Sequence, residues 1–154
     1  MNVDPLLPTG YRLHAFSEVD STNDAAMRAV ADGAGHGDVF VAGRQTAGRG
    51  RRGRRWDSPA GNLHVSLVVE PPPDARIGQL AFVAALGAGA AIDELAPAGA
   101  RLGYKWPNDL LLNGRKVGGI LIEAMTGDMR VGAVIVGVGI NLVHAPDDAG
   151  WPAT

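Results

Sequence analysis

The chain contains no cysteine, which excludes a disulfide framework and any metal site with cysteine ligands. It has no basic segment followed by an apolar one near its start, so no signal peptide is predicted. The longest apolar run, around 80–92, contains Gly87 and Gly89, and we expect it to be too short to span a bilayer. These absences predict a cytoplasmic protein that does not enter a membrane. At 154 residues, we expect one domain over 1–154.

Lysine is also scarce, with two residues against twelve arginines, although the net charge is only −2. Six of the arginines fall within residues 43–56, where Gly48, Gly50 and Gly53 separate them. Six guanidinium groups that cannot lose their charge are too costly to desolvate for this stretch to belong to a core. Glycine lets a backbone approach a ligand closely. The stretch therefore predicts a flexible loop that binds a compact anion such as a triphosphate.

Two helices are predicted. The first begins after Ser21, which with Asp24 matches the S-x-x-[DE] capping pattern, and it stops at Gly33. This start is typical of an ordinary N-cap, but it also gathers hydroxyl, amide and free backbone N–H groups that suit a small polar ligand. The second helix is expected over 76–95, after a run of three prolines.

The strand pattern predicts an α+β fold with a mixed, largely antiparallel sheet flanked by helices. Residues 62–70 alternate cleanly, which predicts a strand and makes His64 a strand-face residue rather than a metal ligand. Asn113-Gly114 is the strongest hairpin signal in the chain. The other predicted strands cover 11–19, 38–43, 101–106, 109–112, 115–124 and 130–138.

Residues 48–53 match the pattern G-x-G-x-x-G of dinucleotide-binding folds. That site requires a helix opening at the last glycine, and here a loop and a strand follow, so a Rossmann site is not predicted. Both lysines, Lys105 and Lys116, flank one predicted hairpin. Asn108 and Asp109 beside them are equally compatible with turn chemistry after proline and with contacts to a magnesium–nucleotide complex.

Four segments together resemble a known family: DSTN at 20–23, AGRGRRGRRW at 47–56, KWPNDLLLNGRKVGGILIE at 105–123 and GVGIN at 137–141. Residues 17–143 are similar to the catalytic domain of biotin–protein ligases, also called biotin–[acetyl-CoA-carboxylase] ligases. The resemblance implies a fold like that of class II aminoacyl-tRNA synthetases. It also implies that biotin and MgATP form biotinyl-5′-AMP, and that biotin then passes to a lysine of a biotin carboxyl carrier protein.

The resemblance also implies roles for individual residues near the arginine loop. Those that match the biotin-recognition positions are Ser21, Thr22, Asn23 and Gln45. Those that match the ligand-ordered loop are Arg49, Gly50 and Arg51, with Arg51 expected to contact both the biotin carboxylate and the phosphate. Arg54 and Trp56 match the nucleotide side, whereas Arg52 and Arg55 are expected to be solvated.

In the second half of the chain, Lys116 matches the lysine that bridges the biotin carboxyl group and the α-phosphate, and it is the expected main catalytic cation. The predicted nucleotide contacts are Lys105, Asn108, Asp109 and Asn141, with Asp109 as the magnesium ligand. Gly118 and Gly119 are expected either to let the backbone approach biotin or to form a β-bulge.

The chain departs from the family pattern at both ends, where an N-terminal helix-turn-helix and the usual C-terminal portion are not found. We therefore expect no DNA binding. Three alternatives stay open: a shortened relative that binds biotin with little ligase activity, a lipoate or octanoate ligase, and a small arginine-rich RNA-binding module. A homodimer is compatible with the sequence.

Overall fold

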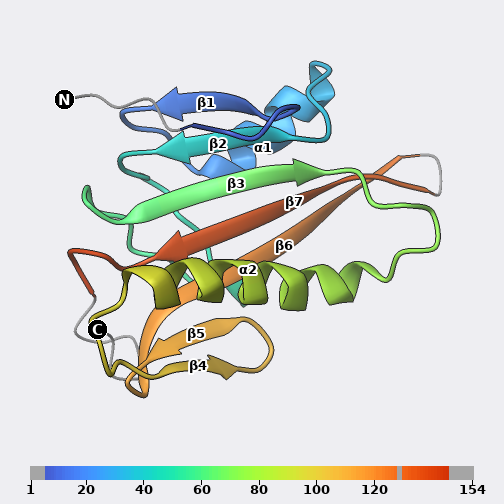
Figure 1. The fold of residues 1–154 in the computed structure, drawn as a ribbon. Helices are drawn as coiled ribbons and strands as arrows, with labels where there is room; N and C mark the ends of the chain where they lie inside the picture. The colour runs from blue at the N-terminus through green and yellow to red at the C-terminus, as the bar shows by residue number, and fades with distance from the viewer. Residues whose placement is uncertain (1–5, 128–129, 146–154) are drawn as a thin grey trace.

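The computed structural model describes residues 6–127 and 130–145 and contains a seven-stranded sheet in the order β1-β2-β3-β7-β6-β5-β4 (Figure 1). Only β1 and β2 are parallel, and every other neighbouring pair is antiparallel. The predicted mixed, largely antiparallel sheet is therefore confirmed. The strands are β1 (Arg12–Phe16), β2 (Asp38–Ala42), β3 (Leu63–Val69), β4 (Leu102–Lys105), β5 (Asp109–Leu112), β6 (Arg115–Gly127) and β7 (Arg130–Ile140).

Helix α1 (Thr22–Ala31) starts where the capping pattern predicted. Ser21 has extended backbone, and its side chain accepts a hydrogen bond from the Asp24 N–H at 3.4 Å. The helix ends just before Gly33, whose φ of +101° favours glycine. Its Ala25 and Ala26 pack against a cluster that includes Phe40 of β2, and this packing fixes the start of the helix above the middle of the sheet.

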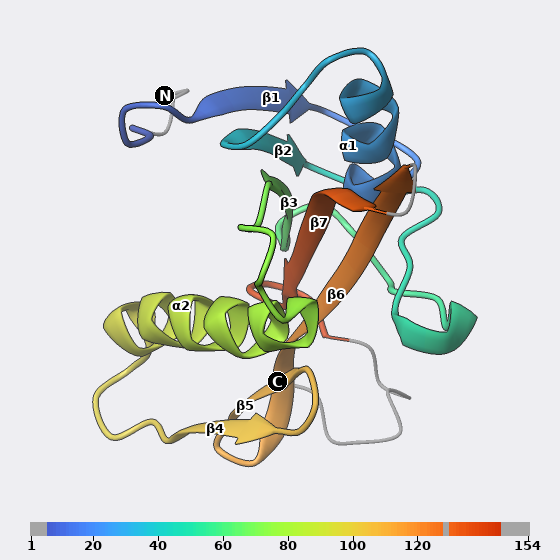
Figure 2. The same ribbon diagram turned by 90° about the vertical axis from the view of Figure 1, so that its right-hand side faces the viewer.

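Helix α2 (Leu80–Leu95) lies on the opposite face of the sheet from α1 (Figure 2). Ile92 of this helix packs against Leu110, Val117 and Ile140, while part of the outer surface of the helix is exposed. The helical segment Ile77–Leu95 is long and apolar enough, by length and composition, to cross a membrane, so the expectation that this run is too short was wrong. Only 11% of its most apolar part is buried in the structure, whereas the core helix of a soluble protein that passes the same test is mostly buried.

Strand β3 alternates as predicted, but its polar face is the more deeply buried one. His64, Ser66 and Val68 are at most 2% exposed. In the sheet register, His64 lies beside Gly139 and Ser66 beside Gly137 on β7. The α1 face of the central strands therefore combines small and polar residues, which leaves room for a cavity above them.

Candidate active site

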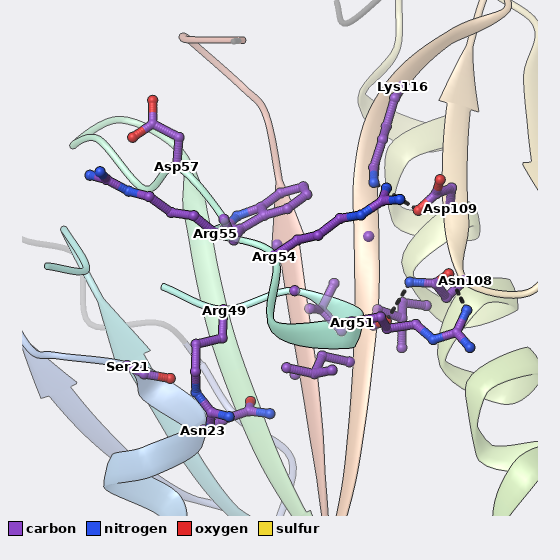
Figure 3. A pocket seen from close by; sticks show the side chains of 18 of the residues that line it. Ser21, Asn23, Arg49, Arg51, Arg54, Arg55, Asp57, Asn108, Asp109 and Lys116 are labelled. Carbon is purple, nitrogen blue, oxygen red and sulfur yellow. Dashed lines mark hydrogen bonds and ion pairs between the residues drawn. The ribbon is translucent and has the colours of Figure 1, made fainter. Parts of the chain in front are cut away.

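A cavity of about 1010 Å³ opens on the α1 face of the sheet, between the start of α1, the arginine loop and the β5–β6 hairpin (Figure 3). All of the predicted site residues except Gly118 line it. The structure thus brings together segments from 20–23, 43–56, 105–119 and 137–141. This convergence tests their placement only, and the chemical role of each residue stays a prediction.

The start of α1 forms a buried, hydrogen-bonded end of this cavity. The Thr22 N–H donates to Gln45 Oε1 at 2.8 Å, and Gln45 Nε2 donates to Ser58 Oγ at 2.8 Å. Ser66 Oγ lies 2.8 Å from Thr22 Oγ1 and 2.5 Å from Asn23 Oδ1. Because these groups are already paired and buried, this end is organised before any ligand binds.

Asp20 supports the same end from outside the cavity. Its carboxylate accepts hydrogen bonds from Arg28 and from the Ser21 N–H, and these bonds lower the Asp20 pKa to about 2. The carboxylate is therefore ionised at neutral pH and holds the chain in place directly before the N-cap.

The arginine loop is folded. The Gly50 N–H donates to the Arg54 carbonyl at 2.7 Å, the Trp56 N–H donates to the Gly48 carbonyl at 2.9 Å, and a 3₁₀ turn covers Arg51–Gly53. Arg51 Nη1 donates to Asn108 Oδ1 at 3.2 Å across the cavity. The loop that was predicted to be flexible therefore contains internal hydrogen bonds that the sequence did not predict.

The arginines of the loop do not all behave alike. Arg52 and Arg55 are exposed, as predicted for solvated residues, although both also line the cavity. Arg54 is exposed as well, and its side chain extends in the opposite direction from that of Arg55 (Figure 3).

Arg49 differs from Arg51, Arg52, Arg54 and Arg55 because its charge is already compensated. Its guanidinium pairs with Asp24 of α1 and, at 3.0 Å, with Glu123 of β6. Burial lowers the Arg49 pKa, but Glu123 and Asp24 outweigh that effect, so the pKa is raised. Arg49 was predicted as a ligand contact, and its observed contacts anchor the loop to the fold.

Trp56 lies against a row of glycines. A Cβ added at Gly139 would lie 2.6 Å from the Trp56 ring, and one at Gly119 would lie 3.3 Å from it. These two glycines are register partners on β7 and β6. The Trp56 Nε1 is buried and makes no hydrogen bond to any described residue.

A β-bulge places Lys116 in the cavity. In the β5–β6 register Leu110 pairs with Gly118 and Leu111 pairs with Lys116, so Val117 is the extra residue. Lys116 and Gly119 consequently face the cavity, where Lys116 Nζ lies 2.8 Å from Asp109 Oδ1 and 5.3 Å from the centre of the Trp56 ring.

The same bulge is followed by Gly118, which faces the α2 side of the sheet. Its added Cβ would lie 2.9 Å from the Gly139 carbonyl oxygen and near Leu110 and Ile140, on the α2 side of the sheet. Gly118 does not line the cavity, so the structure does not bring it together with the other predicted site residues. The alternative prediction, a β-bulge at the glycine pair, describes this position better.

The predicted nucleotide contacts lie at the same end as Lys116. Lys105 lines the cavity. Asn108 Nδ2 donates to the Ile120 carbonyl at 2.9 Å, which turns its Oδ1 toward Arg51. The Asn141 N–H donates to the Val117 carbonyl at 2.7 Å, so the bulged residue also positions Asn141.

Four residues that shape the cavity were not predicted from the sequence motifs: Ser66, Glu123, Gly137 and Gly139. An added Cβ at Gly137 would collide with the Asn23 amide, as one at Gly139 would collide with Trp56. Two glycines two positions apart on a strand share one face, so the GVG pattern at 137–139 was a signal that could have located them. Ser66 and Glu123 had no such signal.

The sequence model of the biotin/lipoate A/B protein ligase family matches residues 16–141. The chain belongs to this family. Among the relatives of this chain is the biotin–[acetyl-CoA-carboxylase] ligase of Paracoccus denitrificans, which is 48% identical over 86% of the chain and 55% of the relative. The ligase of the same name from Mycobacterium tuberculosis is 37% identical over 95% of the chain and 55% of the relative. The chain thus spans about half the length of these curated relatives.

Solved structures show the same fold. The biotin protein ligase of Leishmania major in complex with biotinyl-5-AMP matches with a TM-score of 0.77 and 34% identity, over 96% of this chain and 63% of that one. The biotin protein ligase of Aquifex aeolicus in complex with biotin and ATP matches with a TM-score of 0.75 and 35% identity, over 92% and 58%. The predicted family and fold class are therefore confirmed, and the family match disfavours the RNA-binding module.

Proposed function

We propose that this protein is a biotin–protein ligase that forms biotinyl-5′-AMP from biotin and ATP and transfers the biotinyl group to a lysine of a biotin carboxyl carrier domain. The supporting observation is one cavity in which a buried, hydrogen-bonded end meets a cationic end. The first end suits an uncharged polar group such as the head of biotin. The second end suits the carboxylate and phosphates that must react.

In the first step, a biotin carboxylate oxygen forms a bond to the α-phosphorus of ATP, the bond to the bridging oxygen breaks, and pyrophosphate leaves. Two anions approach each other, so fixed cations at the reacting phosphorus lower the barrier. Lys116 and Arg51 are the residues proposed for this role. Asp109 and Asn108 hold these two side chains at the cavity before substrate arrives.

Asp109 and Asn108 also fit a magnesium ion that enters with the nucleotide. Magnesium is commonly held by one or two carboxylates together with substrate phosphates. The described residues contain no cluster of three or more His, Asp or Glu side chains that could hold a metal alone. When bound, the ion would supply positive charge to the phosphates.

In the second step, the neutral amine of the acceptor lysine attacks the carbonyl carbon of biotinyl-5′-AMP. The amide bond forms, the bond from carbon to the phosphate oxygen breaks, AMP leaves, and the amine releases a proton. The adenylate is prone to hydrolysis, so a cover that excludes water protects it. The loop around Arg51–Gly53 and the Trp56 ring lie where such a cover is needed.

The decisive experiment is biotin-dependent exchange of labelled pyrophosphate into ATP, followed by transfer of labelled biotin to a purified carrier domain. We expect exchange that requires biotin, and then label on the carrier lysine. If biotin binds but no exchange occurs, the protein binds biotin without acting as a ligase. Exchange driven by lipoate or octanoate but not by biotin would point to the other ligases of the family.

A further inference from the structure

Glu123 lies just outside the cavity lining but contacts two residues within that lining. Its Oε1 accepts a hydrogen bond from Arg49 Nη1 at 3.0 Å. Its Oε2 accepts from Asn23 Nδ2 at 2.7 Å and from Arg49 Nη2 at 3.2 Å. One carboxylate on β6 therefore holds both a residue of the predicted biotin-recognition end and Arg49 of the loop.

The carboxylate determines how the Asn23 amide is oriented. An ionised carboxylate can only accept hydrogen bonds, so the Asn23 amide must turn its NH₂ group toward Glu123. The amide oxygen then faces Ser66 Oγ at 2.5 Å, where a hydroxyl donor is available. With Ser66 fully buried and Asn23 only 4% exposed, water does not supply a substitute partner for either group.

The same carboxylate also anchors the loop at Arg49. Arg49 comes between Gly48 and Gly50, and its guanidinium bridges Glu123 on β6 and Asp24 on α1. By contrast, Arg51, Arg52, Arg54 and Arg55 make no ion pair with any of the described residues. Glu123 thus neutralises the loop arginine whose side chain lies beside Asn23 (Figure 3).

We infer that Glu123 is a positioning residue that couples substrate recognition to the loop. It orients Asn23, anchors Arg49 and keeps the recognition end free of excess positive charge, without contacting the substrate itself. This inference rests on the proposed function, because it assigns the hydrogen-bonded end of the cavity to the uncharged head of biotin.

Glu123→Gln tests the inference with almost no change of shape. The glutamine amide offers one acceptor where two donors, Asn23 Nδ2 and Arg49, must be satisfied, so one of these contacts is lost. We expect the dissociation constant of biotin, measured by calorimetry without ATP, to rise by about tenfold or more, since bonds to charged acceptors are among the strongest in proteins. ATP binding should change by less than about twofold, because Arg51, Arg54 and Lys116 are untouched.

Limited trypsin digestion gives a second measurement that needs no ligand. Cleavage after the loop arginines should be several-fold faster in Glu123→Gln, because the loop has lost half of its anchor. Glu70→Gln is the matched control, since Glu70 accepts the His36 N–H at 3.2 Å at the far end of β3. This control should keep the wild-type biotin affinity and cleavage rate.

The outcomes separate the inference from the proposed function. Wild-type protein that does not bind biotin would overturn the proposed function and the recognition part of the inference, while unchanged loop cleavage in Glu123→Gln would overturn the anchoring part. If the wild-type protein binds biotin, but no more tightly than Glu123→Gln does, the inference alone is overturned. If Glu123→Gln loses biotin and ATP affinity equally and its melting temperature falls as well, Glu123 has only a general structural role. This result would also overturn the inference.

Discussion

The two ends of the cavity differ in how much of their structure exists before a ligand arrives. At the α1 end, Thr22, Asn23 and Ser66 are buried and already hydrogen-bonded to protein groups. At the other end, Arg51 and Arg54 are exposed, and Lys116 is ion-paired with Asp109. A neutral ligand group gains most from fixed partners, whereas charged groups can recruit side chains that are still solvated. The difference predicts separate responses of biotin and ATP to mutation, salt and pH.

The largest effect is expected from removing the cation at the reacting centre. Lys116→Ala should slow single-turnover formation of the adenylate by about 100- to 1000-fold, because a fixed charge no longer stabilises the transition state. The melting temperature should stay close to wild type, because Lys116 lies in the cavity and not in the core. Arg115→Ala, at the exposed neighbouring position, is the control and should retain the normal rate. An unchanged adenylation rate in Lys116→Ala would disprove the proposed role.

A smaller effect should follow from crowding the nucleotide end. Gly139→Ala adds a Cβ only 2.6 Å from the Trp56 ring, so the ring must move. We expect ATP affinity to fall by about tenfold, a typical cost of overpacking, with little change in biotin affinity. Gly132→Ala on the same strand is the control, since nothing lies within 4 Å of its added Cβ. Equal effects of the two substitutions would contradict the contact with Trp56.

Salt should separate the two ends without any mutation. Raising ionic strength screens exposed charges more than buried hydrogen bonds, so ATP affinity should fall several-fold between about 0.05 and 0.5 M salt. Biotin affinity should change by less than about twofold over the same range. Calorimetric titrations of each ligand provide the measurement. Parallel losses for biotin and ATP would indicate that the two ends are not electrostatically distinct.

The smallest effect concerns acid and the buried polar face of β3. His64 is 2% exposed, and burial lowers its pKa below the ordinary value of 6.5 despite a hydrogen bond to the Pro59 carbonyl at 3.2 Å. The unfolded chain therefore binds a proton more readily. Stability should be complete above pH 6.5 and should decrease as the pH falls from there toward the lower pKa of the folded state.

Urea unfolding at about pH 7.5 and about pH 5.5 measures this decrease. His64→Gln should be less sensitive to that interval, because it cannot titrate but can still donate to Pro59. Asp20 and Asp38 remain ionised throughout, since their partners lower both pKa values. Identical pH profiles for wild type and His64→Gln would show that His64 does not control the transition.

Much of the fold could be predicted because its signals are local. Ser21 and Asp24 define a helix start within four residues, and Asn113-Gly114 defines a hairpin through positive φ values of 52° and 78°. The placement of most cavity residues was also predicted, because they belong to contiguous motifs. These features depend on neighbours in the sequence, which a single chain displays directly.

Contacts between distant segments could not be predicted from the sequence. The two carboxylate partners of Arg49, one of them 74 residues away, could not be identified without the sheet register. Ser66 and Glu123 look like ordinary strand residues until the register places them beside Asn23. Gly118 was assigned to the cavity because the sequence alone does not show where a bulge interrupts the regular alternation of side chains along a strand.

The bulge at Val117 makes the location of Lys116 a matter of parity. If the same residues alternated regularly, without a bulge, the lysine would lie on the same face of the sheet as α2, among Ile92, Leu110 and Ile140. A chain shorter by this one valine would need no bulge, because its lysine would then lie two positions before Gly119 and on the same face as that glycine. Related sequences should therefore keep the lysine in the cavity either with the extra residue and a bulge or with neither, whereas an extra residue without a bulge would present the lysine to the wrong layer.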